Sequence, residues 1–178
     1  MYDRAKFWTH PIRAAGAWSE MAEVNAMLGA VLLQRWTKKN FNRLVAQKDV
    51  AAVMRGWSED GVFELPGTSA LSGRFEGRPQ IEAWVRKWFD SIATIEFSVK
   101  RVAVTNPLAF GFTNDVMIEW EVREATHRHA SVTARGITVW ELRRGKLIAA
   151  RDYFFDPSVL DALHGPRPAP DPALPSDA

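Results

Sequence analysis

After Ala93 the chain alternates between apolar and polar residues with a period of two, and this pattern restricts the fold more than any other feature. The segments that show it are "IEFSVKRVAV", "AFGFTNDVMIEWEVRE", "SVTARGITVWELRR" and "KLIAARDYFF". They are enriched in β-branched and aromatic residues, and short polar connections separate them. We therefore expect an antiparallel sheet of four strands joined by hairpins.

The preceding half of the chain favours helices. Between Trp18 and about Gln47, apolar residues recur at three- and four-residue steps. Asp49 can cap a second helix that ends at Gly61, and Pro79 can begin a third, "PQIEAWVRKWFDSI". "VFELPG" reads as a brief strand and "TSALSGRFEG" as a loop. The expected fold class is α+β, with three N-terminal helices packed on a strongly curved antiparallel sheet.

The length of 178 residues suits one substantial core with extensions at both ends. We expect residues 1–30 to form an N-terminal helical extension and residues 31–164 to form the domain. The segment 165–178, "GPRPAPDPALPSDA", is expected to be a disordered tail, because its proline density prevents helices and strand ladders.

Composition excludes several classes of function. The 23 basic and 21 acidic residues are spread along the chain without a basic arm, which disfavours nucleic acid as a partner. The absence of cysteine excludes disulfides, thiolate metal sites and thiol nucleophiles. The longest apolar run, Ala26 to Leu33, is too short to span a membrane, and the first residues do not resemble a signal peptide. We expect a cytoplasmic protein that does not bind membranes.

Asp152 is the most unusual polar residue in the strand pattern. It lies in "IAARDYFFD", where Ile148, Ala150, Asp152 and Phe154 share one face of the strand. If that face is buried, desolvation raises the pKa of the carboxyl group and makes it a general acid or base near neutral pH. The alternative is a structural ion pair with an arginine such as Arg135.

The segment "IEWEVRE" places Glu119 and Glu121 on one face and Trp120 on the other. Beside Asp152, the two glutamates would form an acidic cluster in which repulsion retains a proton. Alternatively, they face solvent while Trp120 lies inside, as in any half-buried strand. Glu64 likewise has an inward and an outward alternative.

Metal and cofactor signatures are weak or missing. His127 and His129 are two residues apart and lack a third ligand at a supporting position. The sequence has no glycine-rich phosphate loop and no nucleophile elbow. We expect no metal and no cofactor.

The succession "SEDGVFELPG", "FEGRPQIEAWV" and "GKLIAARDYFFD" resembles the SnoaL-like branch of the nuclear transport factor two-like superfamily, over roughly Leu32 to Leu163. The resemblance implies a cone-shaped α+β domain that encloses a pocket, with Asp152 on its concave face. It also implies a homodimer. The fold hosts isomerases, cyclases, hydrolases and proteins without known chemistry, so it does not fix a reaction.

Three subfamilies can be compared by residue. In SnoaL polyketide cyclases an aspartate late in the sheet acts as acid/base, and Asp152 lies in about that region, so the resemblance leaves this reaction open. The positions of the carboxylate and the two donors of ketosteroid isomerases hold Leu65, Phe41 and Thr138 here, which argues against that reaction. Limonene epoxide hydrolases have a similar C-terminal strand, and the resemblance gives Asp152 the place of their catalytic aspartate.

In those hydrolases an Arg and a second Asp lie two residues apart on an earlier strand. Glu119 and Glu121 occupy these positions here, so the arginine that would orient the carboxylates is missing. The known epoxide hydrolase constellation is therefore incomplete.

Two hypotheses remain. The first is a cofactor-independent enzyme that hydrolyses, isomerises or cyclises a small hydrophobic or polycyclic molecule. In it Asp152 is the general acid/base, and Glu119, Glu121 or Glu64 supports its protonation state. The pocket is expected to be lined by the following residues: Phe41, Trp57, Glu64, Trp84 and Trp88. The second hypothesis is a non-catalytic module for ligand binding or dimerisation.

Overall fold

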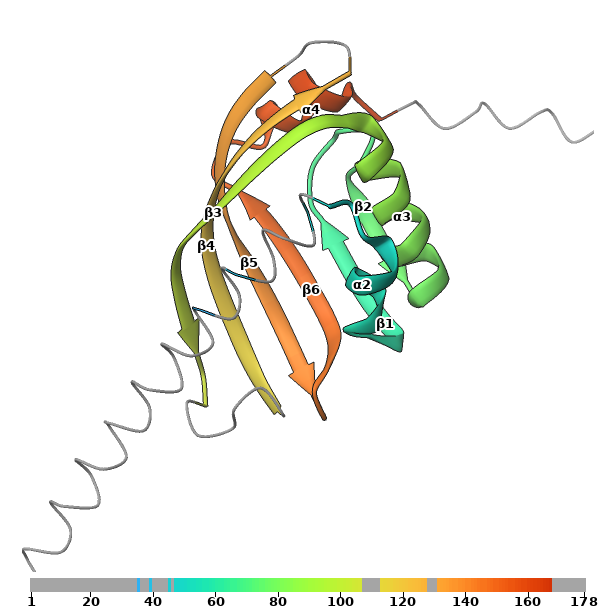
Figure 1. Cartoon of the computed structure of the whole chain (residues 1–178), viewed down its shortest axis with the longest axis vertical. Coiled ribbons are helices and arrows are strands. Elements are labelled where there is room, and N and C mark those ends of the chain that lie inside the picture. Colours follow the sequence, from blue (N-terminus) through green and yellow to red (C-terminus); the bar gives the residue numbers. More distant parts are fainter. Residues whose placement is uncertain are drawn as a thin grey trace, which may run out of the picture.

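The computed structural model describes residues 35, 39, 45, 47–106, 113–127 and 131–167. The expected N-terminal extension, Phe41 and His129 lie outside the described residues. The described part is a bent six-stranded sheet with strand order β2-β1-β6-β5-β4-β3. Helices α2 and α3 lie on one side of the bend, and α4 lies at one end (Figure 1).

The strands predicted after Ala93 are confirmed. They are β3 (Ile92–Val104), β4 (Thr113–Thr126), β5 (Ser131–Arg143) and β6 (Lys146–Phe154). Strand β1 (Trp57–Leu65) is longer than predicted, and β2 (Gly73–Glu76) forms inside the segment predicted as a loop.

One strand pair corrects the expectation of a purely antiparallel sheet. Strand β1 pairs with β6 in parallel, whereas every other described pair is antiparallel. Parallel neighbours need a long crossover rather than a hairpin. Here the connection between β1 and β6 consists of the rest of the domain. Local sequence patterns cannot reveal a pairing between strands so far apart in the chain.

Helix α2 (Val50–Arg55) begins as predicted but ends early. The Asp49 carboxylate caps it by accepting a hydrogen bond from the Ala52 N–H at 2.9 Å. The predicted continuation to Gly61 is wrong, because β1 already begins at Trp57, which pairs with Leu147 of β6. Pairing with the sheet therefore outweighs the helical periodicity of this segment.

Helix α3 (Arg78–Ser91) confirms the third predicted helix, with Pro79 in its first turn. Its buried side chains are Ile81, Trp84, Val85 and Phe89. Helix α4 (Ser158–His164) was not predicted, although Gly165 ends it and Leu160 and Leu163 are buried. None of the described helices is long and apolar enough to span a membrane.

The core lies on the side of the sheet that α3 covers, which we call the inner face. One cluster joins the helices to β1 and β6, and its largest members are Met54, Trp57, Phe63, Trp84 and Phe89. A second cluster lies on β3, β4 and β5, and consists of Val99, Val116, Ile118, Trp120, Val122 and Ala134. Trp140 and Phe154 pack against both clusters, so the apolar inner face is continuous.

Candidate functional site

Asp152 lies on the inner face of the sheet. Strand alternation places it on the same side as Ala150, which is buried in the first core cluster. Asp152 pairs with Thr138 on the neighbouring strand β5, and Thr138 in turn pairs with Ile118 of β4. The carboxyl group therefore lies in an apolar surface. This agrees with the prediction that the face of the strand carrying Asp152 is buried.

A chain of hydrogen bonds ends at this carboxylate. Trp120 Nε1 donates to Thr138 Oγ1 at 2.8 Å, and Thr138 Oγ1 donates to Asp152 Oδ1. Trp120 is only 2% exposed, and Thr138 is also buried. Among the described residues Asp152 Oδ2 has no hydrogen-bond partner, whereas Oδ1 accepts the hydrogen bond from Thr138.

Burial raises the pKa of Asp152 to about 6, while the hydrogen bond from Thr138 opposes this rise by favouring the charged form. Protein surrounds the carboxyl group, yet the residue as a whole keeps intermediate solvent exposure. Both properties fit a group on a concave surface, which is enclosed by neighbours but open on one side. Such a carboxyl group can take up and release a proton near neutral pH.

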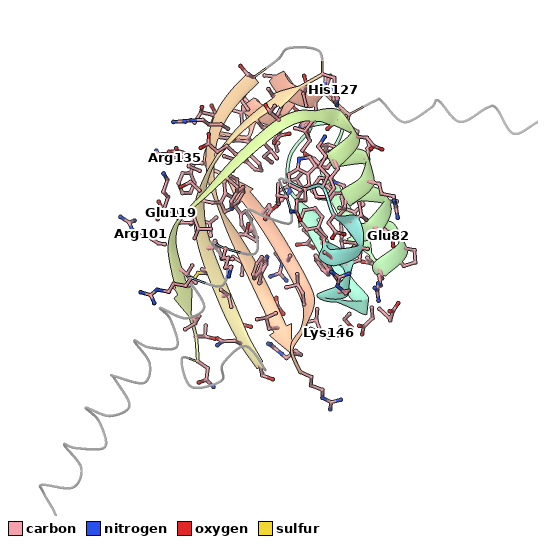
Figure 2. All side chains as sticks on the ribbon, in the orientation of Figure 1. Glu82, Arg101, Glu119, His127, Arg135 and Lys146 are labelled. Carbon is pink, nitrogen blue, oxygen red and sulfur yellow. The ribbon has the colours of Figure 1, made fainter. Side chains whose placement is uncertain are left out.

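Glu119 and Glu121 do not join Asp152. They lie on the outer face, the side of the sheet turned away from α3, where Glu119 pairs with Arg101 at 3.0 Å and Glu121 with Lys100 at 3.5 Å. Figure 2 shows Glu119 beside Arg101, away from Glu82 of α3. Because successive residues of a strand face opposite sides, burying Trp120 turns both glutamates outward. The acidic cluster is not formed.

Glu64 is also on the outer face, which corrects its predicted place in the pocket. Its carboxylate accepts a hydrogen bond from Arg151 Nε at 3.0 Å and forms an ion pair with Arg74. Arg151 also binds Glu141 at 2.9 Å. Glu64 therefore belongs to a network of surface ion pairs.

The predicted aromatic residues pack mainly on one another. The Trp84 ring centroid lies 4.4 Å from that of Phe63 and 5.5 Å from that of Trp88. Trp57 and Trp84 are buried, whereas Trp88 keeps intermediate exposure. These tryptophans fill the interior, and only Trp88 retains a partly free surface.

A cleft of about 380 Å³ lies apart from Asp152, beside the last turns of α3. Its lining residues are Lys48, Val50, Arg86, Phe89, Asp90 and His127. The described residues contain no group of three or more side chains able to hold a metal ion.

Glu124 and His164 form a buried contact that sequence reasoning missed. Their side chains are 6% and 4% exposed, and Glu124 Oε1 lies 3.2 Å from His164 Nε2. The two atoms are close, but His164 Nε2 has no hydrogen-bond partner among the described residues. Trp88 Nε1 donates to the same carboxylate at 3.4 Å. The sequence did contain a signal for the burial of Glu124. Alternation along the strand places it on the same side as Trp120 and Val122, which are buried.

The bent sheet, the helices on its inner face and the carboxyl group within that face define a cone-shaped α+β domain of the nuclear transport factor two-like type. A family model of the SnoaL-like domain matches residues 39–150, which is more than half of the chain. The chain belongs to the SnoaL-like family.

Solved structures agree with this assignment at the level of the fold. A nuclear transport factor two-like protein of unknown function from Burkholderia pseudomallei is 19% identical, with a TM-score of 0.59 over 79% of this chain and 97% of that chain. A proposed isomerase from Bacillus subtilis is 23% identical, with a TM-score of 0.58 over 79% and 95%. The protein TerC, co-crystallised with polyporic acid, is 16% identical, with a TM-score of 0.57 over 79% and 95%. No curated protein matches the chain.

Proposed function

We propose that this protein is a cofactor-independent enzyme that isomerises or cyclises a small hydrophobic or polycyclic molecule, with Asp152 as general acid/base. The observation that carries the proposal is a carboxyl group on the apolar inner face that has no cationic partner among the described residues and one oxygen left without a hydrogen bond from them. Its pKa of about 6 gives useful populations of both protonation states at neutral pH.

Because Glu119, Glu121 and Glu64 lie on the outer face, none of the carboxylates predicted to support Asp152 can do so, which favours reactions that one carboxyl group can complete. In an isomerisation, Asp152 removes a proton from one carbon and returns it to another, so protons balance without a second acid. Epoxide hydrolysis needs one group to activate water and another to protonate the leaving oxygen, so this arrangement supports it less. The likeness to a proposed isomerase and to a protein crystallised with polyporic acid is compatible with this choice.

The test is turnover of a panel of enones, polyketide-like ketones and epoxides by the wild type and by Asp152→Asn. General acid/base catalysis contributes about 100-fold or more, so Asp152→Asn should lose at least that factor in kcat. Glu119→Gln, on the outer face, is the matched control and should keep wild-type turnover. Equal turnover by the wild type and Asp152→Asn would remove Asp152 from the mechanism.

A second candidate function is a non-catalytic ligand-binding or dimerisation module. It is favoured by the close packing of Trp57, Trp84 and Trp88, which leaves these rings little free surface for a substrate. In that case ligands would bind without turnover in both the wild type and Asp152→Asn.

We also propose that the protein is a cytoplasmic homodimer that associates through the outer face. Met117 and Tyr153 are each 46% exposed there. Their cross-strand partners are Val139 and Ile137, so the apolar side chains adjoin one another. These apolar side chains lie between the ion pairs of Glu119 and of Arg151 on the outer face.

A further inference from the structure

The chain of hydrogen bonds to Asp152 has a fixed direction. An indole N–H can only donate, so Trp120 must be the donor to Thr138 Oγ1 at 2.8 Å. The single hydroxyl proton of Thr138 is then free to point at Asp152 Oδ1. If Thr138 instead accepted a hydrogen bond from protonated Asp152, its own hydroxyl proton would have to point away from Asp152, the only described carboxylate that it reaches.

We propose that Thr138 is a positioning residue that reserves Asp152 Oδ1 as an acceptor, so that Oδ2 alone exchanges the proton with the substrate. This inference rests on the proposed acid/base role of Asp152. Oδ1 keeps the Thr138 hydrogen bond in both protonation states, and the acid proton resides on Oδ2, to which no described residue makes a hydrogen bond. The carboxyl plane is thereby fixed relative to the inner face.

Trp120 makes the arrangement rigid. It is buried among the residues of the second cluster, and its ring lies 5.4 Å from Phe97 and 4.9 Å from Phe154 between centroids. A buried indole has few alternative acceptors, so Thr138 Oγ1 stays in place. Residues from β4, β5 and β6 therefore hold one oxygen of one carboxyl group.

Removing the Thr138 hydroxyl should raise the pKa of Asp152, because the charged form loses a donor that stabilises it. A hydrogen bond of ordinary strength corresponds to a shift of about one pH unit in Thr138→Val. Thr138→Ser keeps the hydroxyl and should stay near the wild type. Thr126→Val is the matched control, because it deletes a buried hydroxyl that has no hydrogen-bond partner among the described residues.

The experiment follows the carbon resonance of the Asp152 carboxyl group against pH in these variants. An upward shift in Thr138→Val alone supports the proposal, and an unchanged or lower midpoint overturns it. If Thr138→Val fails to fold, the indole N–H resonance of Trp120 in the wild type gives the answer. It should titrate with the Asp152 midpoint and stay flat in Asp152→Asn, and a flat wild-type curve overturns the proposal.

These readouts do not depend on turnover, so the two proposals can fail separately. An upward shift in Thr138→Val without any loss of activity in Asp152→Asn keeps the hydrogen-bond chain and rejects the catalytic role. If both proposals hold, the pH dependence of kcat should move in Thr138→Val in the same direction as the NMR midpoint.

Discussion

Asp152 and Glu119 are both acids in strands of the same sheet, yet their surroundings give them different chemistry. Glu119 faces solvent and pairs with Arg101 across the outer face. Asp152 has no cationic partner among the described residues and accepts a hydrogen bond only from Thr138. An exposed ion pair contributes little to stability, whereas a carboxylate in an apolar wall costs free energy whenever it is charged.

This cost predicts the pH dependence of stability. The folded protein binds the Asp152 proton more tightly than the unfolded chain does, because the pKa is about 6 when folded and about 3.9 in model peptides. The contribution to stability is therefore full below about pH 4 and lost as the pH rises through about 6. Asp152→Asn should raise the free energy of unfolding by roughly 2 kcal/mol at pH 8 and by much less at pH 4.

Urea unfolding of the wild type and the variant at both pH values measures this difference. Asp90→Asn, at an exposed position on α3, is the control and should follow the wild type throughout. If Asp152→Asn raised the free energy of unfolding by the same amount at both pH values, Asp152 would not be desolvated in the folded protein.

Among the elements, the strands were the most predictable part. The period of two places Trp120 and Glu119 on opposite faces of the sheet, and likewise Asp152 and Arg151. The structure confirms both assignments. The pattern could not say which face is concave, because curvature and helix cover arise only from tertiary packing. Glu124 shares the parity of Trp120 and Val122, so the alternation did indicate its burial, but its partner His164 lies on α4, far along the chain.

The contact of Glu124 with His164 predicts how α4 is held on the sheet. Each side chain is nearly inaccessible, and Glu124 also accepts a hydrogen bond from Trp88, so Glu124→Gln disturbs buried polar contacts on β4, α3 and α4. Glu124→Gln should lower the free energy of unfolding by about 1–2 kcal/mol. Glu96→Gln, which breaks an exposed pair with Arg123, should cost less than about 0.5 kcal/mol. Equal costs in chemical unfolding would show that the buried contact is not important for docking α4.

At the scale of the whole molecule, sequence motifs identified the family correctly but not the functional constellation. The order of helices and strands and the motif around Asp152 led to the SnoaL-like fold, which the family model and the sheet confirm. Alternation on β4 sets Glu119 and Glu121 opposite Trp120, but which of the two faces is buried depends on the packing of the whole domain, and no local pattern contains it.

The proposed dimer is also a property of the whole molecule. Met117→Asp places a charge in the apolar part of the outer face and should disrupt association, because burying an unpaired charge is costly. Sedimentation velocity should give twice the 20.1 kDa mass of one chain for the wild type and the single mass for the variant. Asp90→Lys on α3 should remain dimeric. A wild type that is monomeric at all concentrations would reject the dimer.

The most direct test of the account is the titration of the Asp152 carboxyl group in the wild-type protein, identified by comparison with Asp152→Asn and followed by carbon NMR. Its position on the inner face predicts a midpoint near pH 6. A midpoint near the ordinary aspartate value of about 3.9 would mean that water solvates this carboxylate freely, and the proposed acid/base chemistry would be wrong.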